Sequence, residues 1–376
     1  MSQAALDALP IVLAALVAAA LASFVLTPLT IRFAARLGAI DTPGSDRRVH
    51  STPIPRTGGL AVAGAFVGVG LLGLLLSQAF HFAPPLRTVR MPEIVALFVG
   101  VSVGGILGYI DDRFELRARW QFIGQLVLAG IAVAFGIRID RLPNPLGDNL
   151  MLGEAAAIAA TTLWVVGMLN SVNFVDGLDG LLAGIALIAV ATLGVISLID
   201  PPIQPAVAVL CALLAGALLG FLPYNFHPAR VFIGTAGVFA VGYALAVLSV
   251  IGTAKVALAL LVLGVPIIDT FWIIIRRVTS GRSPFSADRG HFHHRLLDLG
   301  LSHRQAVVLI YAICSLLAVL SLVLSGRGQI SAFLVVVLGG GLALYLLTRR
   351  ARGALDRRSY SDEAANGAPD DALGGR

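Results

Sequence analysis

Two adjacent carboxylates, Asp111 and Asp112, follow an apolar run and are the first candidates for chemistry. If that run is a helix, the pair lies at its carboxyl terminus, where the helix dipole disfavours negative charge. The compensating positive charge is either an arginine, with Arg113, Arg117 and Arg119 nearby, or a divalent cation held together with substrate phosphates. The sequence leaves both interpretations open.

A second polar cluster reads Asn170-Ser-Val-Asn173-Phe-Val-Asp176-Gly-Leu-Asp179-Gly-Leu. Asp176 and Asp179 would share one face if helical, at the start of an apolar run whose helical amino terminus favours anions. Helix capping explains one aspartate. It does not explain two aspartates, two asparagines and two glycines so close together, so a catalytic or metal-binding role is favoured over a structural turn.

A third cluster packs histidines and arginines into one short segment, comprising Arg289, His291, His293, His294 and Arg295. Neighbours at this spacing cannot all face one tetrahedral zinc ion, and no cysteine assists them. Arginine and histidine donors suit phosphate recognition better. A solvated basic loop is the alternative, and the clustering favours phosphate binding.

Asp269 is an ionisable residue inside an apolar run, just after Pro266. Such a group in a membrane segment is a functional candidate by default. It is equally well explained as a partner for Arg276 or Arg277, nearly two helical turns further on. The sequence does not decide between the two.

The segments that must position these groups are strongly apolar. Of 376 residues, 57% are hydrophobic and only 13% charged, about half the charged fraction of a soluble domain. Apolar runs recur at close to the roughly 20 residues that cross a bilayer, which predicts an all-α polytopic membrane protein. The chain has a net charge of +6, and in a membrane protein an excess of arginine is expected in the cytoplasmic loops. Nothing in the sequence indicates a nucleic-acid partner. Cys211 and Cys314 both lie in apolar runs, so packing is expected rather than a disulfide or metal site.

About eleven transmembrane helices are predicted from the apolar runs. Their centres lie near Ala19, Gly70, Val101, Val127, Leu163, Val190, Leu213, Val241, Leu263, Ala318 and Val337. The first run is too long for a signal-peptide core and has no basic residue before it, so it is expected to be retained. Residues 138–153 contain a Pro-Asn-Pro turn between alternating apolar residues, which predicts a short external β-hairpin.

The distribution of basic residues predicts the orientation. Placing the amino terminus outside puts 21 of the 27 basic residues inside, so the carboxyl terminus is expected to be cytoplasmic. The aspartates and most histidines then lie at the cytoplasmic face. Residues 1–348 are expected to form the membrane domain, and the charged tail, 349–376, to be disordered.

Together these segments resemble the polyprenyl-phosphate N-acetylhexosamine-1-phosphate transferase family, of the glycosyltransferase 4 type, from about residue 37 to 300. The matching pieces are Gly38-Ala-Ile-Asp41-Thr-Pro43, Arg48-Val-His50, Pro53-Ile-Pro55-Arg56-Thr-Gly58-Gly59, Gly108-Tyr-Ile-Asp111-Asp112-Arg113-Phe114, Asn173-Phe-Val-Asp176-Gly-Leu-Asp179-Gly, Pro266-Ile-Ile-Asp269 and Asp288-Arg289-Gly-His291-Phe-His293-His294-Arg295. The histidine-rich form with Arg295 is similar to the branch that uses UDP-N-acetylglucosamine, rather than the branch that loads the muramoyl pentapeptide.

The resemblance implies transfer of a sugar 1-phosphate, most simply N-acetylglucosamine 1-phosphate, from a UDP-sugar to polyprenyl phosphate such as undecaprenyl phosphate. UMP is released, and the reaction starts cell-envelope glycan synthesis on the cytoplasmic side of a bacterial inner or plasma membrane. The implied cofactor is Mg²⁺, with Mn²⁺ as a substitute, and a homodimer is compatible with the resemblance.

The resemblance also implies roles for individual residues. Asp111, Asp112, Asp176 and Asp179 would be catalytic, and Asp112, Asp176 and Asp179 would hold the metal. The substrate-binding residues would be Asn173, Arg289, His291, His293, His294 and Arg295.

Two positions depart from the family pattern, and both remove charge. Where the family usually reads Phe-x-Gly-Asp and uses the aspartate as a metal ligand, this chain has Thr235. Where the family commonly has lysine after Trp120, it has Gln121. A hydroxyl is a poorer ligand for a hard cation than a carboxylate. The alternative hypothesis is therefore a catalytically impaired member that binds lipid phosphate or nucleotide sugar without turnover. A transporter is disfavoured because the polar residues lie at one face rather than at the midplane.

Overall fold

The computed structural model describes residues 2–41, 53–80, 89–142, 144, 147–251, 256–279, 281, 292–324 and 327–341. The chain divides into two compact units, 1–333 and 334–376, and the elements discussed below belong to the first. The helices are α1 (Gln3–Leu37), α2 (Gly58–Phe80), α3 (Met91–Phe114), α4 (Ala118–Ala134), α5 (Glu154–Val175), α6 (Leu181–Ile199), α7 (Pro205–Asn225), α8 (Gly234–Val250), α9 (Val256–Val262), α10 (Gly264–Thr279), α11 (Phe292–Asp298) and α12 (His303–Val323). The predicted tail, 349–376, lies outside the described residues.

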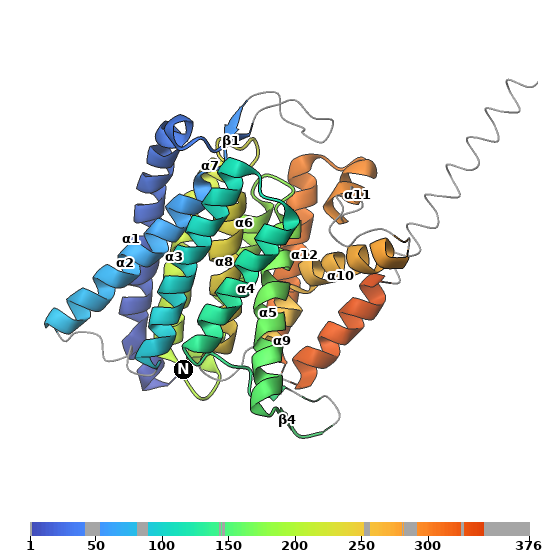
Figure 1. The fold of residues 1–376 in the computed structure, drawn as a ribbon. Coiled ribbons are helices and arrows are strands. Elements are labelled where there is room, and N and C mark those ends of the chain that lie inside the picture. The colour runs from blue at the N-terminus through green and yellow to red at the C-terminus, as the bar shows by residue number, and fades with distance from the viewer. Residues whose placement is uncertain are drawn as a thin grey trace, which may run out of the picture. The chain divides into compact units, whose positions relative to one another are not determined.

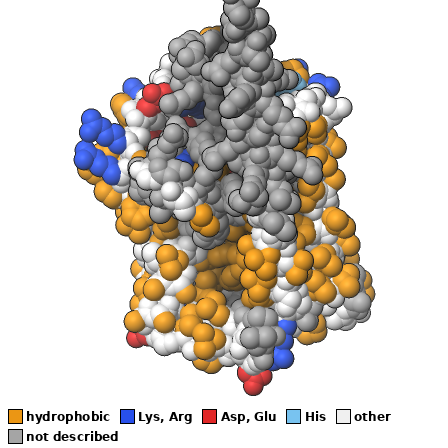
Figure 2. Space-filling view, turned by 90° about the vertical axis from the view of Figure 1, so that its right-hand side faces the viewer, with side chains coloured by type: hydrophobic (Ala, Val, Ile, Leu, Met, Phe, Trp, Pro, Cys, Tyr) orange, Lys and Arg blue, Asp and Glu red, His pale blue; other side chains and the backbone are white. Residues whose placement is uncertain are grey.

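The helices confirm an all-α polytopic membrane protein. Among the described residues, seven helices are long and apolar enough to cross a membrane, namely α1, α2, α3, α5, α6, α7 and α12. Three apolar helices are shorter: α4, α8 and Arg327–Gly341. Ten of the predicted span centres fall within one of these helices. In the face drawn in Figure 2, hydrophobic side chains cover much of the surface below and beside the part drawn in grey, and charged side chains are seen at the upper left and at the lower edge.

The predicted span around Leu263 is wrong as a single helix. The chain forms the seven-residue α9, turns at Leu263, and starts again as α10. Gly264 and Pro266 explain the break, because glycine weakens a helix interior and proline lacks the N–H that a helix interior needs but fits a first turn. In Figure 1, α10 runs nearly crosswise to α5, which it contacts.

Two small antiparallel sheets lie in the loops. The predicted hairpin is confirmed, since β3 (Arg141–Leu142) pairs with β4 (Leu150–Met151). A second sheet, between β1 (Ile40–Asp41) and β2 (Ile54–Pro55), was not predicted. Two-residue strands leave almost no alternation in the sequence from which to predict them.

Helices α3 and α8 are packed very closely at the end of the bundle where β1 lies (upper end in Figure 1). A Cβ added to Gly108 of α3 would lie 2.3 Å from the carbonyl oxygen of Thr235 in α8. Real Cβ atoms do not approach a backbone oxygen so closely, so only glycine allows the carboxyl end of α3 to meet the amino end of α8 at this distance.

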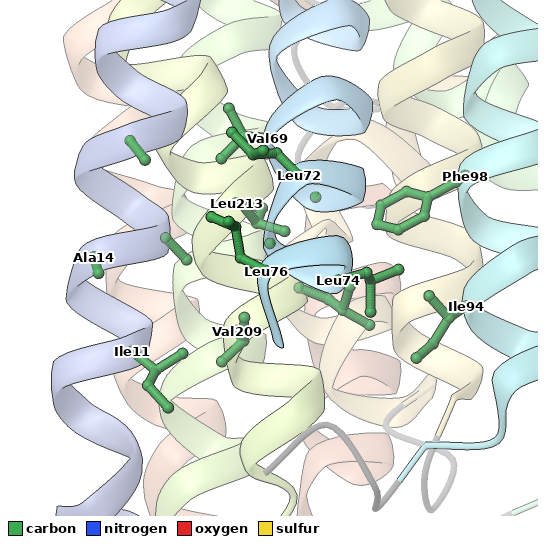
Figure 3. A pocket seen from close by; sticks show the side chains of 15 residues that line it. Ile11, Ala14, Val69, Leu72, Leu74, Leu76, Ile94, Phe98, Val209 and Leu213 are labelled. Carbon is green, nitrogen blue, oxygen red and sulfur yellow. The ribbon is translucent and has the colours of Figure 1, made fainter. Parts of the chain in front are cut away.

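An apolar cavity of about 230 Å³ lies between α1, α2, α3 and α7 (Figure 3). Its lining includes Ile11, Val69, Phe98 and Leu213, and no ionisable residue. A dry hydrocarbon cavity cannot carry phosphate chemistry, so the candidate site must be sought among the polar helix ends.

Candidate active site

Asp112 caps the amino terminus of α8 from the neighbouring helix. Its Oδ1 accepts a hydrogen bond from the backbone N–H of Thr235 at 2.8 Å, and its Oδ2 accepts one from Ala236 at 2.9 Å. Gly234, at φ +67°, begins this turn in the left-handed region, and a Cβ there would lie 2.7 Å from Oδ2. The first N–H groups of a helix lack partners within it and favour a carboxylate.

This contact answers the question of what compensates the acidic pair. Both carboxylates are only 7% exposed, whereas Arg113, Arg117 and Arg119 are exposed. Among the described residues, none of these three arginines forms an ion pair with either aspartate. The amino terminus of α8 therefore supplies part of the positive charge that compensates the acidic pair. From the sequence, an arginine or a divalent cation was expected in this role.

Asp111 accepts hydrogen bonds from three neutral donors. Its Oδ2 accepts from the Thr235 hydroxyl at 2.7 Å, and its Oδ1 accepts from the Gln121 amide at 3.0 Å and from the Leu116 N–H at 3.1 Å. The two positions that depart from the family pattern thus contact the same carboxylate. With three donors in place, Asp111 is better suited to fix the geometry of the pair than to bind a cation.

Arg56 brings positive charge to the aspartates of the site. Its guanidinium is anchored on the buried Asp41 at 2.8 Å. The backbone around it joins the start of α8, because Phe232 N–H donates to the Pro55 carbonyl and Gly58 N–H to the Phe232 carbonyl. Arg56 interacts electrostatically with both Asp112 and Asp176.

Asp176 lies in the turn between α5 and α6, so it is not helical and does not share a helix face with Asp179. Burial, followed by the charge of Asp112, raises the pKa of Asp176 to about 7, although Arg56 acts in the opposite direction. Its carboxylate makes no hydrogen bond or ion pair to any residue that the structure describes. Asp176 is therefore a half-buried carboxylate near other negative charge, with no direct partner among the residues that the structure describes.

Asp179 contacts residues from two other parts of the chain. Its Oδ2 lies 2.7 Å from Nδ1 of His227 and accepts from the Ala229 N–H at 3.1 Å. Its backbone N–H donates to Nε2 of His303 at 2.9 Å, and the two imidazole rings stack with centroids 4.2 Å apart. The α5–α6 turn, the α7–α8 loop and the start of α12 are thereby held together.

The two asparagines of the predicted motif have different surroundings. Asn170 pairs with Gln125 of α4, donating to its Oε1 at 2.8 Å, so it joins two helices. Asn173 lies half-buried in the last turn of α5, and its carbonyl accepts from the Asp176 N–H at 3.3 Å. The predicted substrate contact of Asn173 stays a prediction.

The structure says less about the histidine-rich cluster. Arg289 and His291 lie outside the described residues, and the side chains of His293 and His294 are likewise not described. The backbone of 292–298 forms the short helix α11, in which Arg295 is half-buried and has interactions of its own. Their predicted role in binding the nucleotide is neither confirmed nor contradicted.

The buried Asp269 lies in α10 and has an interaction partner. The guanidinium of Arg277, also buried, lies 5.8 Å from the ring centroid of Phe174, next to Asn173. Neither residue contributes a described contact to the aspartates of the site.

Sequence reasoning missed three residues of the site: Arg56, His227 and His303. Arg56 was part of a matching segment and lies at the end of a short strand, but a single arginine in a basic loop carries no signal of its own. His227 and His303 are isolated in sequence, 48 and 124 residues from Asp179. Only the folded chain brings them together.

The residues present fit a divalent cation. Asp176 offers carboxylate oxygens without hydrogen bonds to the described residues, and each oxygen of Asp112 keeps a lone pair beyond the one that α8 occupies. Hard oxygen donors next to uncompensated negative charge are what Mg²⁺ binds. The hydroxyl of Thr235 donates its proton to Asp111, and its neutral oxygen is a weaker ligand for a hard cation than a carboxylate.

The sequence was compared with known proteins. Residues 94–253 match the profile of glycosyl transferase family 4. A relative from Bacillus subtilis, described as a probable undecaprenyl-phosphate N-acetylglucosaminyl 1-phosphate transferase, is 37% identical over 87% of this chain and 89% of its own. The decaprenyl-phosphate N-acetylglucosaminephosphotransferase of Mycobacterium tuberculosis is 35% identical over 90% of this chain and 89% of its own. A phospho-N-acetylmuramoyl-pentapeptide-transferase from a Geobacillus strain is 30% identical over 82% and 96%.

The similarity to these relatives spans most of both chains, and the family profile includes Asp111, Asp112, Asp176 and Asp179. The chain belongs to the polyprenyl-phosphate N-acetylhexosamine-1-phosphate transferase family.

Proposed function

We propose that this protein transfers a sugar 1-phosphate, most simply N-acetylglucosamine 1-phosphate, from a UDP-sugar to polyprenyl phosphate. An oxygen of the acceptor phosphate forms a bond to the phosphorus that carries the sugar. The bond between that phosphorus and the bridging oxygen breaks, and UMP leaves with the oxygen. The names of the relatives from Bacillus and Mycobacterium support both the acceptor class and the sugar.

The observation that carries the proposal is the convergence of carboxylates at one end of the bundle. Asp112 ends α3, Asp176 follows α5, the charge of Asp112 acts on Asp176, and Arg56 acts on both. Phosphoryl transfer requires positioning and charge neutralisation more than covalent chemistry. Arg56 can contact a phosphate, while the carboxylates hold a cation between two phosphate-bearing substrates.

The aspartates divide these tasks. Asp112 and Asp176 hold the cation, and Asp111 keeps Asp112 in place through its three hydrogen bonds. A bound magnesium ion supplies charge neutralisation for the phosphates as they approach each other. The side chains of the segment 289–295, including His291, His293 and His294, bind the nucleotide diphosphate.

The proposal keeps about eleven membrane passes, with the broken pair α9 and α10 in place of one continuous ninth helix, the amino terminus outside and the active site facing the cytoplasm of a bacterium. The distribution of basic residues supports this orientation. A phosphate acceptor on a lipid demands a site at the membrane boundary, which agrees with carboxylates at helix ends. A homodimer is retained as part of the proposal.

Thr235 favours a second candidate, a member that binds its substrates without turnover. The missing carboxylate lowers the expected metal affinity. The structure indicates how the missing negative charge is balanced. Compared with the usual aspartate and lysine of the family, Thr235 removes one negative charge and Gln121 removes one positive charge, and both side chains contact Asp111. The net charge of the site is thereby kept.

The experiment is a turnover assay on purified protein in lipid nanodiscs. With Mg²⁺, UDP-N-acetylglucosamine and undecaprenyl phosphate, we expect UMP release that Asp112→Asn abolishes. Glu93→Gln, which changes a carboxylate at the opposite end of α3, is the matched control and should retain activity. Binding of both substrates without UMP release from any UDP-N-acetylhexosamine would establish the second candidate instead.

A further inference from the structure

The cluster of Asp179, His227 and His303 has a chemistry that the proposed function does not yet use. One ligand atom from each residue lies within 4.8 Å of the others, as in a metal site. The rings are nearly parallel, however, with 16° between their planes and 4.2 Å between centroids. A metal binds imidazole nitrogen close to the ring plane, and two stacked planes cannot both contain one ion. The geometry therefore argues against a shared metal.

The hydrogen bonds fix where the protons are. A carboxylate only accepts, so Nδ1 of His227 must donate to Asp179. Nε2 of His303 accepts the Asp179 N–H, so it carries no proton and His303 is neutral. The carboxylate therefore holds the His227 ring with its Nδ1 toward Asp179, which leaves Nε2 as the ring nitrogen that can contact a ligand.

The orientation of His227 is fixed from several sides. Arg304 donates from Nε and a terminal nitrogen to the His227 carbonyl, at 3.2 and 3.0 Å. The turn that carries Asp179 is held by Asn225, whose Oδ1 accepts from the Gly180 N–H at 3.1 Å, and by Tyr311, which donates to the Gly180 carbonyl. Nε2 of His227 has no hydrogen-bond partner among the described residues, and its side chain is 37% exposed.

We propose that His227 binds a substrate phosphate through Nε2, and that Asp179 positions His227 instead of ligating the cation. The inference rests on the proposed function and deepens it. The pair formed by Asp179 and His227 borders the proposed cation site, since the charge of Asp179 acts on Asp176 three residues earlier. Imidazolium with an oriented N–H is a strong donor to phosphate oxygen. The phosphate belongs either to the nucleotide or to the lipid.

The first test separates these two sources. In nanodiscs, KM for UDP-N-acetylglucosamine and for undecaprenyl phosphate is measured for wild type, His227→Gln and the control Glu93→Gln, which lies at the end of α3 opposite the carboxylates. We expect His227→Gln to raise KM roughly tenfold or more for one substrate only, and that substrate carries the bound phosphate. Glu93→Gln should change either KM less than about threefold, because it removes only a partly exposed ion pair with Arg90. Unchanged KM values for both substrates in a folded His227→Gln would overturn the proposal.

The second test concerns Asp179 and uses Asp179→Asn, which keeps an acceptor for Nδ1 but removes the charge. We expect its half-saturating Mg²⁺ concentration to stay within about twofold of wild type, whereas Asp176→Asn should raise it at least tenfold. A rise in Asp179→Asn equal to that in Asp176→Asn would identify Asp179 as a metal ligand and contradict the assignment.

If the wild-type protein does not turn over, the proposed function fails while this inference remains testable. Calorimetric titration of UDP and of undecaprenyl phosphate into wild type and His227→Gln then replaces KM. Equal affinities in both proteins would overturn the inference, as would stoichiometric Zn²⁺ binding that His227→Gln abolishes.

Discussion

At the scale of residues, the site is organised around carboxylates in three different situations. Asp111 accepts from three neutral donors, Asp112 caps a neighbouring helix, and Asp176 has no direct partner among the described residues. The sequence presents all three as equivalent acids. Hydrogen bonding, rather than residue type, separates the positioning residue from the residues that can hold a cation.

Asp176 gives a prediction that couples stability to pH. Its pKa is raised from 3.8 to about 7 by burial and the nearby charge of Asp112. Between about pH 4 and 7 the unfolded chain loses this proton while the folded chain keeps it, so the contribution of Asp176 to stability falls as pH rises. In Mg²⁺-free buffer we expect Asp176→Asn to raise Tm at pH 8 and to change it little at pH 4.

The same variant should lose activity by at least about 100-fold, the scale of one missing electrostatic contact to reacting groups. Thermal unfolding followed by tryptophan fluorescence, with and without Mg²⁺, is the measurement. The cation should stabilise wild type and leave Asp176→Asn unaffected. An equal Mg²⁺-induced rise in Tm for both proteins would show that Asp176 does not bind it.

Thr235 and Gln121 give a prediction about coupling. Thr235→Asp alone places a second carboxylate beside Asp111, where the hydroxyl now lies at 2.7 Å, and we expect lower stability without Mg²⁺. Adding Gln121→Lys places a positive charge next to the same carboxylate and should restore the lost stability. Urea unfolding of the two single variants and the double variant should give a coupling free energy of about 1 kcal/mol or more. Additive effects would mean that the two positions do not communicate through Asp111.

At the scale of elements, the site depends on the close meeting of α3 and α8. The carboxyl end of α3 carries negative partial charge and the amino end of α8 carries positive partial charge. Asp112 joins the two ends through its hydrogen bonds to α8. Helix existence was predictable from apolar runs because every span must satisfy its own backbone. The capping of α8 was not, because its partners lie 123 and 124 residues apart and leave no periodic signal.

Gly108 tests this meeting directly. Gly108→Ala would bring a methyl group to 2.3 Å from the Thr235 carbonyl and force α3 away from α8. We expect at least a tenfold loss of activity and a lower Tm, because the carboxylates move with the helix end. Gly105→Ala is the matched control on the same helix, since its methyl group would lie 3.5 Å from the nearest atom and should be tolerated. Equal effects of the two variants would contradict the account.

At the scale of the whole molecule, the composition alone predicted the class of fold. Ten predicted centres fall within apolar helices, seven of which are long enough to cross a membrane. The β3–β4 hairpin and the position of the acidic pair at a helix end also agree with the structure. The break at Leu263 was missed because apolar composition continues through it. The contribution of Arg56, His227 and His303 was missed because it depends on tertiary contacts.

The orientation in the membrane predicts which loops a membrane-impermeant maleimide reaches. Cys211 and Cys314 are buried and should not interfere. We expect Met151→Cys, in the hairpin, to be labelled in intact cells, and Leu299→Cys, between α11 and α12, to be labelled only after permeabilisation. Both positions are similarly exposed, at 63% and 64%. The reverse labelling pattern would invert the topology and place the carboxylates outside.

The most direct test of the central claim follows the phosphorus itself. UDP-N-acetylglucosamine labelled with ³²P at the β position is incubated with the protein in nanodiscs, undecaprenyl phosphate and Mg²⁺. The account predicts that the label appears in the lipid fraction with wild type and not with Asp176→Asn. Label that stays entirely in the aqueous phase with wild type, with Mg²⁺ or Mn²⁺ and with each UDP-N-acetylhexosamine, would contradict it.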